Sequence, residues 1–422
     1  MDTQFAARVA ATVPKETIFL HVYFPGDHGS MLEVPGRQLL NVYSTSYSRS
    51  ALLQGSLSPD GGATWEGPRS LQDPEGVEIS GASPTLMRLK SGRIGLFYCM
   101  TEWIGTGKDA LTGADLRKRD SAGVWFTSSG DEGRTWSKPT RVSEPGVDAI
   151  PLHDSAIVTS RGRIVAPVYH YAGQRNMVPE DAGTCVALSG DRWVRIGGHD
   201  FENCMDFSWV YFSDDDGRTW RRNEDGTMIV TMDYSQGGHY SCEESVAAEV
   251  SPDHLLLVHR TPLGRLYQSW SSDDGTTWSL PEPTWLASSR APASLKRIPG
   301  TDDLLILWSQ ASAEEIRMGY HRHRLSAAIS RDGGVSWQHH RNVRAPEGDP
   351  ARLVEVPPIQ NYRTMKHASR RPAGWRQPYS SYPATALWED RVIITFYSPG
   401  PDAPEDRRGV CMGLPLSWFY AT

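Results

Sequence analysis

Six short polar groups stand directly before, or at the start of, an apolar strand pattern; three of them contain side chains capable of proton transfer, and one contains tyrosine. The six groups are Asp27-His28-Gly29-Ser30, Ser80-Gly81-Ala82-Ser83, His153-Asp154, Glu243-Glu244, Arg290-Ala291-Pro292 and Tyr379-Ser380-Ser381-Tyr382. A histidine can act as general acid or base near neutral pH, and Asp154 beside His153 offers an orienting carboxylate or a second acid. If the fold brings these groups together, they form a candidate catalytic site.

The elements that would position them follow from a repeated motif, S-x-D-x-G-x-T-W. Its five copies begin at Ser58, Ser129, Ser213, Ser271 and Ser330, and the last has Ser336 in place of Thr. Asp and Gly favour a tight turn, the Asp and Ser/Thr side chains can bond back to backbone N–H groups, and the Trp fills the hydrophobic side. The motif therefore predicts a stabilised β-hairpin turn rather than a binding site, and its repetition indicates stacked equivalent units.

A second repeat consists of two apolar strands joined by a Gly or Asp turn. Its six copies begin at Met31, Pro84, Ser155, Ser245, Ala293 and Ala384, and all but the last are followed by a Trp motif. Six hairpins alternating with five motifs predict an all-β fold, a six-bladed β-propeller. One domain over residues 1–422 is expected, and the polar groups should meet around its axis.

Closure of the ring is expected from a strand around residues 17–24 that pairs with the last blade and removes the free sheet edges. Three long segments, near 101–124, 171–209 and 341–380, carry Gly, Pro and charge without strong periodicity. They are expected to be loops, and the last could cover one face.

Composition narrows the class of protein. The net charge of −7 over 422 residues argues against a general nucleic-acid surface, so an anionic substrate would be held by local arginines. The five cysteines are widely spaced and contain no C-x-x-C pair, which fits neither a disulfide framework nor a zinc motif. No apolar run approaches a membrane span, and the first 20 residues lack a signal-peptide pattern, so a cytoplasmic location is expected. The sequence carries no signal for an oligomeric state.

The chain resembles the sialidase superfamily, whose members carry these Trp motifs on a six-bladed propeller. The resemblance covers nearly the whole chain and is most specific in the last three blades. The segment ESVAAEVSPDHLLLVHR, from Glu244 to Arg260, is similar to the family stretch in which a Glu opens one strand and an Arg ends the next. This resemblance implies that Glu244 polarises a catalytic tyrosine and that Arg260 is one of three arginines binding the substrate carboxylate.

Two further segments extend the resemblance. RHRLSAAISRD, from residue 322, is similar to the stretch holding another clamp arginine, which implies Arg322 or, as the alternative, Arg324. YPATALWED, from residue 382, has the family spacing from the nucleophilic tyrosine to the last turn, which implies Tyr382 as nucleophile and Tyr379 as the alternative or a substrate contact. A neutral tyrosine suits a sugar with a carboxylate on its anomeric carbon, because that carboxylate would repel a carboxylate nucleophile. Nearby arginines can also lower the pKa of the tyrosine.

Two family features have no counterpart here. The Arg-Ile-Pro segment that supplies the first clamp arginine is replaced by Asp27-His28-Gly29-Ser30-Met31, and YSRSALLQGSLSPD lacks the family's acid/base aspartate. His28, His153 and Asp154 are the candidates for the acid/base role. A metal site of His28, His153, His239 and Glu244 is another interpretation, but the spacing matches no ligand motif, so neither a metal nor a cofactor is predicted.

Three functions are compatible with these residues. The first is an exo-acting glycoside hydrolase on a terminal sugar that carries a carboxylate. The second is a polysaccharide lyase on uronate sugars, in which Tyr and His perform β-elimination and Arg neutralises the carboxylate. The third is a carbohydrate-binding propeller without catalysis. The hydrolase is favoured because Glu244, Arg260, Arg322 and Tyr382 keep the family order and spacing.

Overall fold

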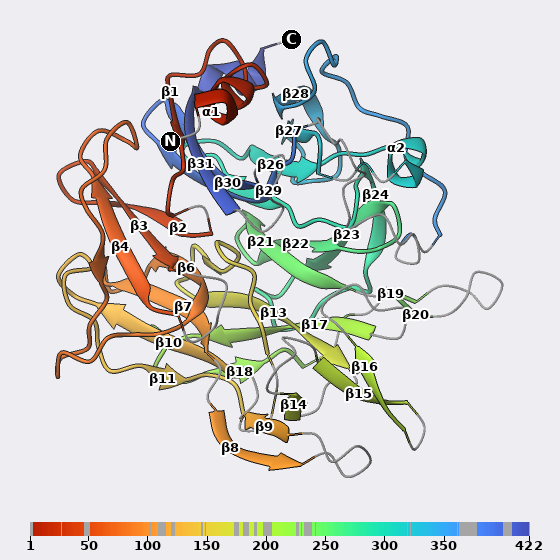
Figure 1. Cartoon of the computed structure of the whole chain (residues 1–422). Helices are drawn as coiled ribbons and strands as arrows, with labels where there is room; N and C mark the ends of the chain where they lie inside the picture. The colour runs from red at the N-terminus through yellow and green to blue at the C-terminus, as the bar shows by residue number, and fades with distance from the viewer. Residues whose placement is uncertain are drawn as a thin grey trace.

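Within the residues that the structure describes, six four-stranded antiparallel sheets surround a common centre (Figure 1). This structure is a computed structural model, and it describes residues 3–26, 28–45, 51–100, 103–108, 115–119, 123–144, 147, 149–172, 177–179, 185–189, 192–196, 205–224, 228, 230–231, 239–240, 242–318, 320, 322–360, 362, 378–399 and 407–421. The predicted six-bladed β-propeller is confirmed.

Each blade runs from an innermost to an outermost strand. Blade 1 contains β2 (Ser30–Val34), β3 (Gln38–Ser44), β4 (Leu53–Ser58) and β5 (Arg69–Ser70). Blade 2 contains β6 (Ala82–Arg88), β7 (Ile94–Met100), β10 (Gly123–Ser129) and β11 (Thr140–Arg141). Blade 3 contains β12 (Ile157–Val158), β13 (Ile164–Ala172), β17 (Met205–Ser213) and β18 (Arg221–Arg222). Blade 4 contains β21 (Glu243–Ser251), β22 (His254–Arg260), β23 (Arg265–Ser271) and β24 (Glu282–Ala287). Blade 5 contains β25 (Ser294–Arg297), β26 (Leu304–Ser309), β27 (Leu325–Ser330) and β28 (Gln338–Arg344).

Blade 6 joins the two ends of the described chain. It contains β29 (Ser381–Trp388), β30 (Arg391–Pro399), β31 (Arg407–Pro415) and, as its outermost strand, β1 (Phe19–Val22). The register places Leu20 opposite Met412 in an antiparallel pair, and Figure 1 shows β1 beside β31. The expected closure by an N-terminal strand is confirmed.

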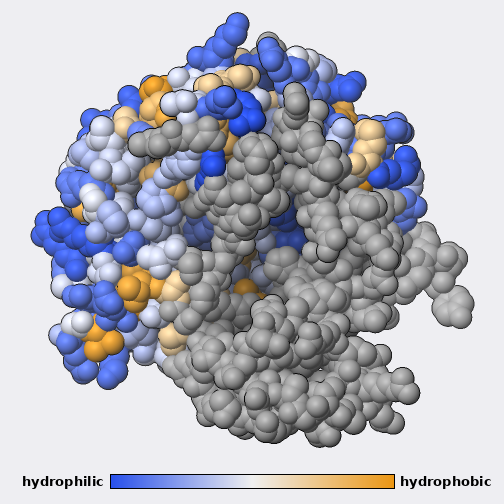
Figure 2. Space-filling view, in the orientation of Figure 1, coloured by the Kyte–Doolittle hydropathy of each residue, from blue (hydrophilic) through white to orange (hydrophobic). Residues whose placement is uncertain are grey.

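The hydrophobic core lies in layers between consecutive blades. One layer contains Leu40 and Leu53 of blade 1 with Leu86 and Leu96 of blade 2. Corresponding layers lie between all the remaining pairs of neighbouring blades. The described surface in Figure 2 is mostly hydrophilic, with small separate hydrophobic areas. Packing between blades therefore holds the ring together, and polar groups are left for the rim and the axis.

The Trp motifs form the predicted turns. In the first copy the Thr64 N–H donates to Asp60 Oδ1 (2.8 Å), the Gly62 N–H donates to Ser58 Oγ (2.7 Å), and the Trp65 indole donates to the Gly62 carbonyl (3.0 Å). The Ser and Asp bonds recur in the other four copies.

Each motif joins the third strand of its blade to the fourth. Blade 6 has no such connection, since its fourth strand comes from the N-terminal part of the chain, and this explains why five motifs serve six blades. The turns also contact the preceding blade: a Cβ on Gly217 of blade 3 would meet the Phe126 ring of blade 2 at 2.2 Å. The motifs thus link blades as well as hairpins.

The expectation of loops is wrong in part. The segment near 101–124 contains the hairpin β8 (Trp103–Lys108) and β9 (Asp115–Arg119), and the segment 171–209 contains β14 (Met177–Pro179), β15 (Cys185–Ser189) and β16 (Arg192–Ile196). Strands such as DLRKR lack apolar alternation, so a period of two could not reveal them. Residues 363–377 of the third segment lie outside the described residues.

The remaining described elements are short. They are β19 (Val230–Thr231), β20 (His239–Tyr240), α1 (Thr3–Ala10), α2 (Ala313–Arg317) and η3 (Leu416–Tyr420). Among the described residues, no helix has the length and apolar character needed to cross a membrane.

Candidate functional site

The innermost strands of three blades begin with a break in their hydrogen-bonded ladder. Register shifts interrupt the pairing near the starts of β6, β21 and β29. At these shifts Ser83, Glu244 and Tyr382 adopt φ angles of 54°, 44° and 56°. Residues with a Cβ rarely take this left-handed conformation, and β-bulges commonly re-aim side chains at functional sites. The backbone therefore adopts an unfavourable conformation at these three residues, and all three stand in polar groups that were selected as candidates from the sequence.

The bulges of β21 and β29 bring Glu244 and Tyr382 together. The Tyr382 hydroxyl donates to Glu244 Oε1 at 2.9 Å. Arg260, at the end of β22, donates through Nη1 to Glu244 Oε2 and lies 3.5 Å from the Tyr382 hydroxyl. Glu244 is only 2% exposed, so this tyrosine–carboxylate–guanidinium contact is shielded from water.

The Tyr382 phenol is held in its neutral form. Burial, together with the charge of Glu244, raises the pKa of Tyr382 to about 12, although Arg260 and Arg322 act in the opposite direction. The arginines therefore do not produce the net lowering of the pKa that their proximity alone would give. Proton removal requires transfer to an acceptor, and Glu244 is in hydrogen-bond contact.

Arg322 lies on the other side of the tyrosine. Its guanidinium carbon is 5.3 Å from the centre of the Tyr382 ring, and Nη1 donates to Ser381 Oγ and to the Tyr379 hydroxyl (3.4 Å). Arg322 is 8% exposed, and its buried Nε has no hydrogen-bond acceptor among the described residues. A buried cationic donor of this kind suits an anionic ligand.

Arg324 belongs to a different network. Its guanidinium bonds Asp349 Oδ2 (2.6 Å) and Glu315 Oε1 (2.8 Å), and Glu315 also contacts His323. Of the two alternatives for the clamp arginine, only Arg322 contacts the tyrosine among the described residues. The roles themselves remain predictions.

Two charged residues at the site were missed as site residues. Glu243 accepts from Arg290 Nε at 2.7 Å and lies 3.4 Å from Arg260 Nε, while the Arg290 carbonyl accepts from Arg322 Nη2 at 3.2 Å. Among the described residues, the three guanidinium groups of Arg260, Arg290 and Arg322 thus lie near the two carboxylates of Glu243 and Glu244, an excess of one positive charge in this group. The available signal was position, since Glu243 is the first residue of the innermost strand β21 and Arg290 stands four residues before the innermost strand β25.

The two candidate histidines both contact the tyrosine but differ in environment. The His28 and His153 rings lie 5.3 and 5.9 Å from the Tyr382 ring and 5.5 Å from each other. His28 is half-buried and also contacts Tyr397, whereas His153 is 3% exposed. Burial, with the adjacent His28, lowers the pKa of His153 to about 3, so His153 is neutral near pH 7.

The Asp154 carboxylate is also buried, and it is fully occupied. It accepts from Ser30 Oγ (2.9 Å) and Lys296 Nζ (2.8 Å) through Oδ1, and from the Thr385 N–H (3.1 Å) through Oδ2. This geometry favours a structural role over proton transfer. Lys296 had not been considered in the sequence.

The metal interpretation gains no support. Among the described residues no group of three or more His, Cys, Asp or Glu side chains could hold a metal ion. Asp27, His321 and the side chain of His239 lie outside the described residues.

Comparison with known proteins gives sialidases and related propellers. Residues 52–394 match the BNR repeat-like domain. A curated protein named sialidase from Bacteroides fragilis is 23% identical over 359 residues, covering 76% of this chain and 57% of that protein. The chain thus spans little more than half the length of this relative.

Solved structures share the fold at low sequence identity. A protein of unknown function from Dyadobacter fermentans has a TM-score of 0.60 and 15% identity, covering 94% of this chain and 98% of its own. The NanB sialidase of Streptococcus pneumoniae has a TM-score of 0.56 and 11% identity, covering 96% and 70%. The Trypanosoma rangeli sialidase has a TM-score of 0.51 and 15% identity, covering 96% and 58%. With most of its length matched to the BNR repeat-like domain, this protein belongs to that family as a sialidase-like propeller.

Proposed function

We propose that this protein is a sialidase-like glycoside hydrolase that removes a terminal sugar carrying a carboxylate. The observation that carries the proposal is the partly buried hydrogen bond from the Tyr382 hydroxyl to the buried Glu244, in contact with Arg260. The sialidases among its relatives and structural neighbours add support. Fold alone would not justify an activity, so the site geometry is the main ground.

In the proposed reaction the Tyr382 oxygen attacks the anomeric carbon and its proton passes to Glu244, 2.9 Å away. The bond from the anomeric carbon to the leaving oxygen breaks, and that oxygen takes a proton from an acid. Water then attacks the anomeric carbon and gives a proton to a base, the bond from that carbon to the Tyr382 oxygen breaks, and the phenolate recovers its proton from Glu244. A neutral phenol at this position avoids repulsion between nucleophile and substrate carboxylate.

The substrate carboxylate would bind beside Arg260 and Arg322. Among the described residues, the site holds one more guanidinium than carboxylates, and buried charge is stable only when it is compensated. A single bound carboxylate would neutralise the excess and accept from the buried Arg322 Nε. This charge balance supports a monoanionic sugar as the substrate class.

His28 is the proposed general acid and base. Its half-buried ring contacts the Tyr382 ring, and a histidine within reach of the reacting atoms can transfer a proton in both directions. His153 is buried and kept neutral, and Asp154 is bound to three donors. His28 would protonate the leaving oxygen and then accept a proton from the attacking water.

The test is a screen of purified protein against aryl glycosides of nine-carbon and eight-carbon acidic keto sugars and of uronates. We expect release of the aglycone from a keto-sugar glycoside, reduced about 10³-fold or more by Tyr382→Phe, because loss of an activated nucleophile acts on this scale. Tyr420→Phe is the matched control, since it removes another tyrosine–carboxylate bond, 2.7 Å from Tyr420 to Asp303, on η3.

The same screen distinguishes the other functions. Ultraviolet absorbance of an unsaturated uronate without aglycone release would assign the protein to the lyases. A Tyr382→Phe variant with full activity would contradict the assigned nucleophile. Binding of an acidic sugar without any turnover would favour the carbohydrate-binding propeller.

A further inference from the structure

Asp154 connects its blade to four others around the axis. Its carboxylate accepts from Ser30 of β2, Lys296 of β25 and the Thr385 N–H of β29, and its own N–H donates to the Pro84 carbonyl of β6 at 3.1 Å. Blade 3 is thereby tied to blades 1, 2, 5 and 6 by one residue. Asp154 itself has a left-handed φ of 57°, a conformation that is retained only when surrounding contacts impose it.

The pair His153 and Asp154 holds the bulge that carries the nucleophile. His153 Nε2 lies 3.3 Å from the Tyr382 carbonyl, so this nitrogen is the one that donates. Three residues further along β29, the Thr385 N–H donates to Asp154 Oδ2 at 3.1 Å. The first bond lies within the register shift between residues 381 and 384, and the second lies directly after it. The left-handed conformation of Tyr382 is therefore fixed from blade 3.

The same carboxylate fixes the strand that follows His28. Ser30 Oγ donates to Asp154 Oδ1 at 2.9 Å and accepts from the Leu86 N–H at 3.0 Å. Ser30 is fully buried and stands two residues after His28, whose ring contacts Tyr382. A shift of Asp154 would therefore move the nucleophile and the acid together.

We propose that Asp154, neutralised by Lys296, is the positioning residue of this site, holding Tyr382 and the histidines in register without transferring a proton itself. A carboxylate that is 5% exposed needs a counter-ion and hydrogen bonds to be stable, and Lys296 and the two other donors provide them. The catalytic consequence rests on the proposed function, whereas the positioning of the rings does not.

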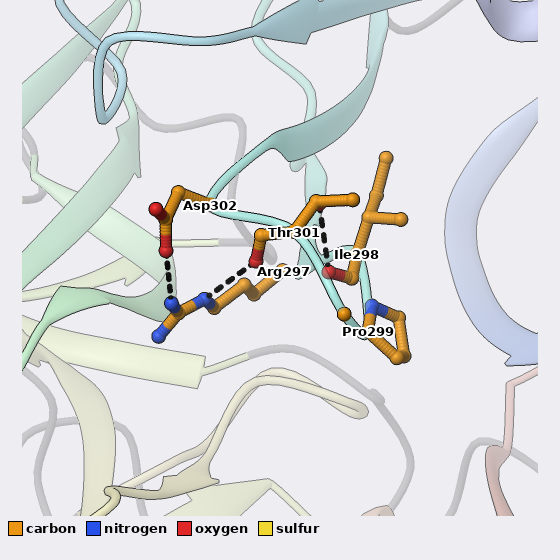
Figure 3. A pocket seen from close by; sticks show the side chains of 6 residues that line it. Arg297, Ile298, Pro299, Thr301 and Asp302 are labelled. Atoms are coloured by element: carbon orange, nitrogen blue, oxygen red, sulfur yellow. Dashed lines mark hydrogen bonds and ion pairs between the residues drawn. The ribbon is translucent and has the colours of Figure 1, made fainter.

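The same strand offers a matched control. Arg297 follows Lys296 in β25 and forms an ion pair with Asp302, Nη2 to Oδ1, at 2.5 Å across the hairpin turn (Figure 3). These side chains are 34% and 87% exposed and line a shallow surface hollow with Pro299 and Thr301. Exposed pairs contribute little to stability, so removing this one tests substitution in β25 without loss of the buried contact.

The experiment compares Asp154→Asn, Lys296→Met and the double variant in the full chain. Protein labelled with ¹⁵N-histidine reports the ring signals of His28 and His153, assigned with His28→Gln and His153→Gln. We expect Asp154→Asn to shift both signals and lower the melting temperature. In the double variant, both the histidine signals and the melting temperature should return toward the wild-type values, because no unpaired buried charge is left. Arg297→Met, Asp302→Asn and their double variant should leave the two signals unchanged.

Kinetics add a second readout when a substrate is turned over. We expect Asp154→Asn to lower kcat at least tenfold without removing a limb of the pH profile, and the double variant to recover part of that loss.

Unshifted histidine signals in Asp154→Asn would overturn the positioning role whether or not any substrate is found. A double variant as displaced as Asp154→Asn would overturn the counter-ion role of Lys296. Loss of one pH limb, equal in single and double variants, would make Asp154 a proton donor instead.

Discussion

At the scale of single residues, the site depends on buried polar groups whose charge state is set by their surroundings. His259, which adjoins Arg260 in the chain, shows the same effect: it is fully buried, and its ring nitrogens bond Ser245 Oγ (2.7 Å) and Ser269 Oγ (2.9 Å). Burial lowers the pKa of His259 to about 3, as it does for His153. Both rings stay neutral in the folded protein at a pH where an unfolded chain would protonate them.

This difference predicts a pH dependence of stability. Between about pH 3 and 6.5 the unfolded state binds a proton at His259 that the folded state does not. The contribution of neutral His259 to the free energy of unfolding is therefore complete above about pH 6.5. As the pH falls below this value, the contribution decreases by about 1.4 kcal/mol per pH unit.

His259→Gln should remove this contribution. In urea unfolding, we expect the stability gap between wild type and variant to narrow by roughly 2 kcal/mol from pH 7.5 to 5.0. Gln keeps hydrogen-bonding capacity toward the two serines, so the variant should still fold. A gap that stays constant across this range would show that His259 does not titrate as its burial requires.

Several residue-level features could not have come from the sequence. Arg322 and Arg324 stand two positions apart and share the same place in any alternating pattern, so only three-dimensional contacts separate them. The left-handed bulge at Tyr382 leaves no trace in an apolar repeat, because one extra residue does not change composition. The partners of Asp154 lie 124, 142 and 231 residues away in the chain, beyond any local spacing rule.

At the scale of elements, the Trp motifs were predictable because their chemistry is local. The Ser and Asp of each copy bond backbone N–H groups within eight residues, and the Trp indole donates to the motif Gly carbonyl in the first, third and fourth copies. Their contact with the preceding blade was not predictable, since it depends on stacking. Gly217 shows both features: its φ of 83° requires a residue without a Cβ penalty, and a Cβ there would overlap the Phe126 ring.

Two glycine substitutions separate these effects. Gly36, in the turn between β2 and β3, has nearly the same φ of 82° but no atom within 4 Å of an added Cβ. We expect Gly36→Ala to lower the free energy of unfolding by about 1–2 kcal/mol because of backbone strain. Gly217→Ala should lower it by the same amount and by a further amount of about 1–3 kcal/mol because of overpacking. Thermal or urea unfolding of the two variants measures the difference. Equal losses would show that the motif turn makes no essential contact with the neighbouring blade.

At the scale of the whole molecule, the ring was predictable because six hairpins and five motifs alternate strictly. The hairpin of β8 and β9 was not, because its polar strands carry no alternation. The ring is completed by β1, which covers the edge of β31 and adds Leu20 and Val22 to the core layer containing Met412 and Leu414. Without β1, β31 would present an unpaired edge to solvent, and unpaired edges promote association.

Removal of residues 1–22 tests this closure. We expect the shortened chain to melt roughly 10 °C or more below the full chain, as a loss of several kcal/mol implies, and to associate during gel filtration. A peptide spanning residues 15–24 should restore the melting temperature in part, whereas a scrambled peptide should not. A shortened chain that stays monomeric with an unchanged melting temperature would show that blade 6 is stable with three strands.

The pairing of β1 with β31 also governs when this protein can become complete during its synthesis. The Arg408 guanidinium donates to the Tyr23 hydroxyl across 385 residues of chain. At 5–20 residues per second, a ribosome needs roughly 20–80 s to add that length. Throughout this interval β1 is outside or leaving the exit tunnel while its partner strand does not yet exist. The nascent chain can stack its first blades in order, but β29, which carries Tyr382, and β31, which pairs with β1, are both made only after the strands of blades 1 to 5.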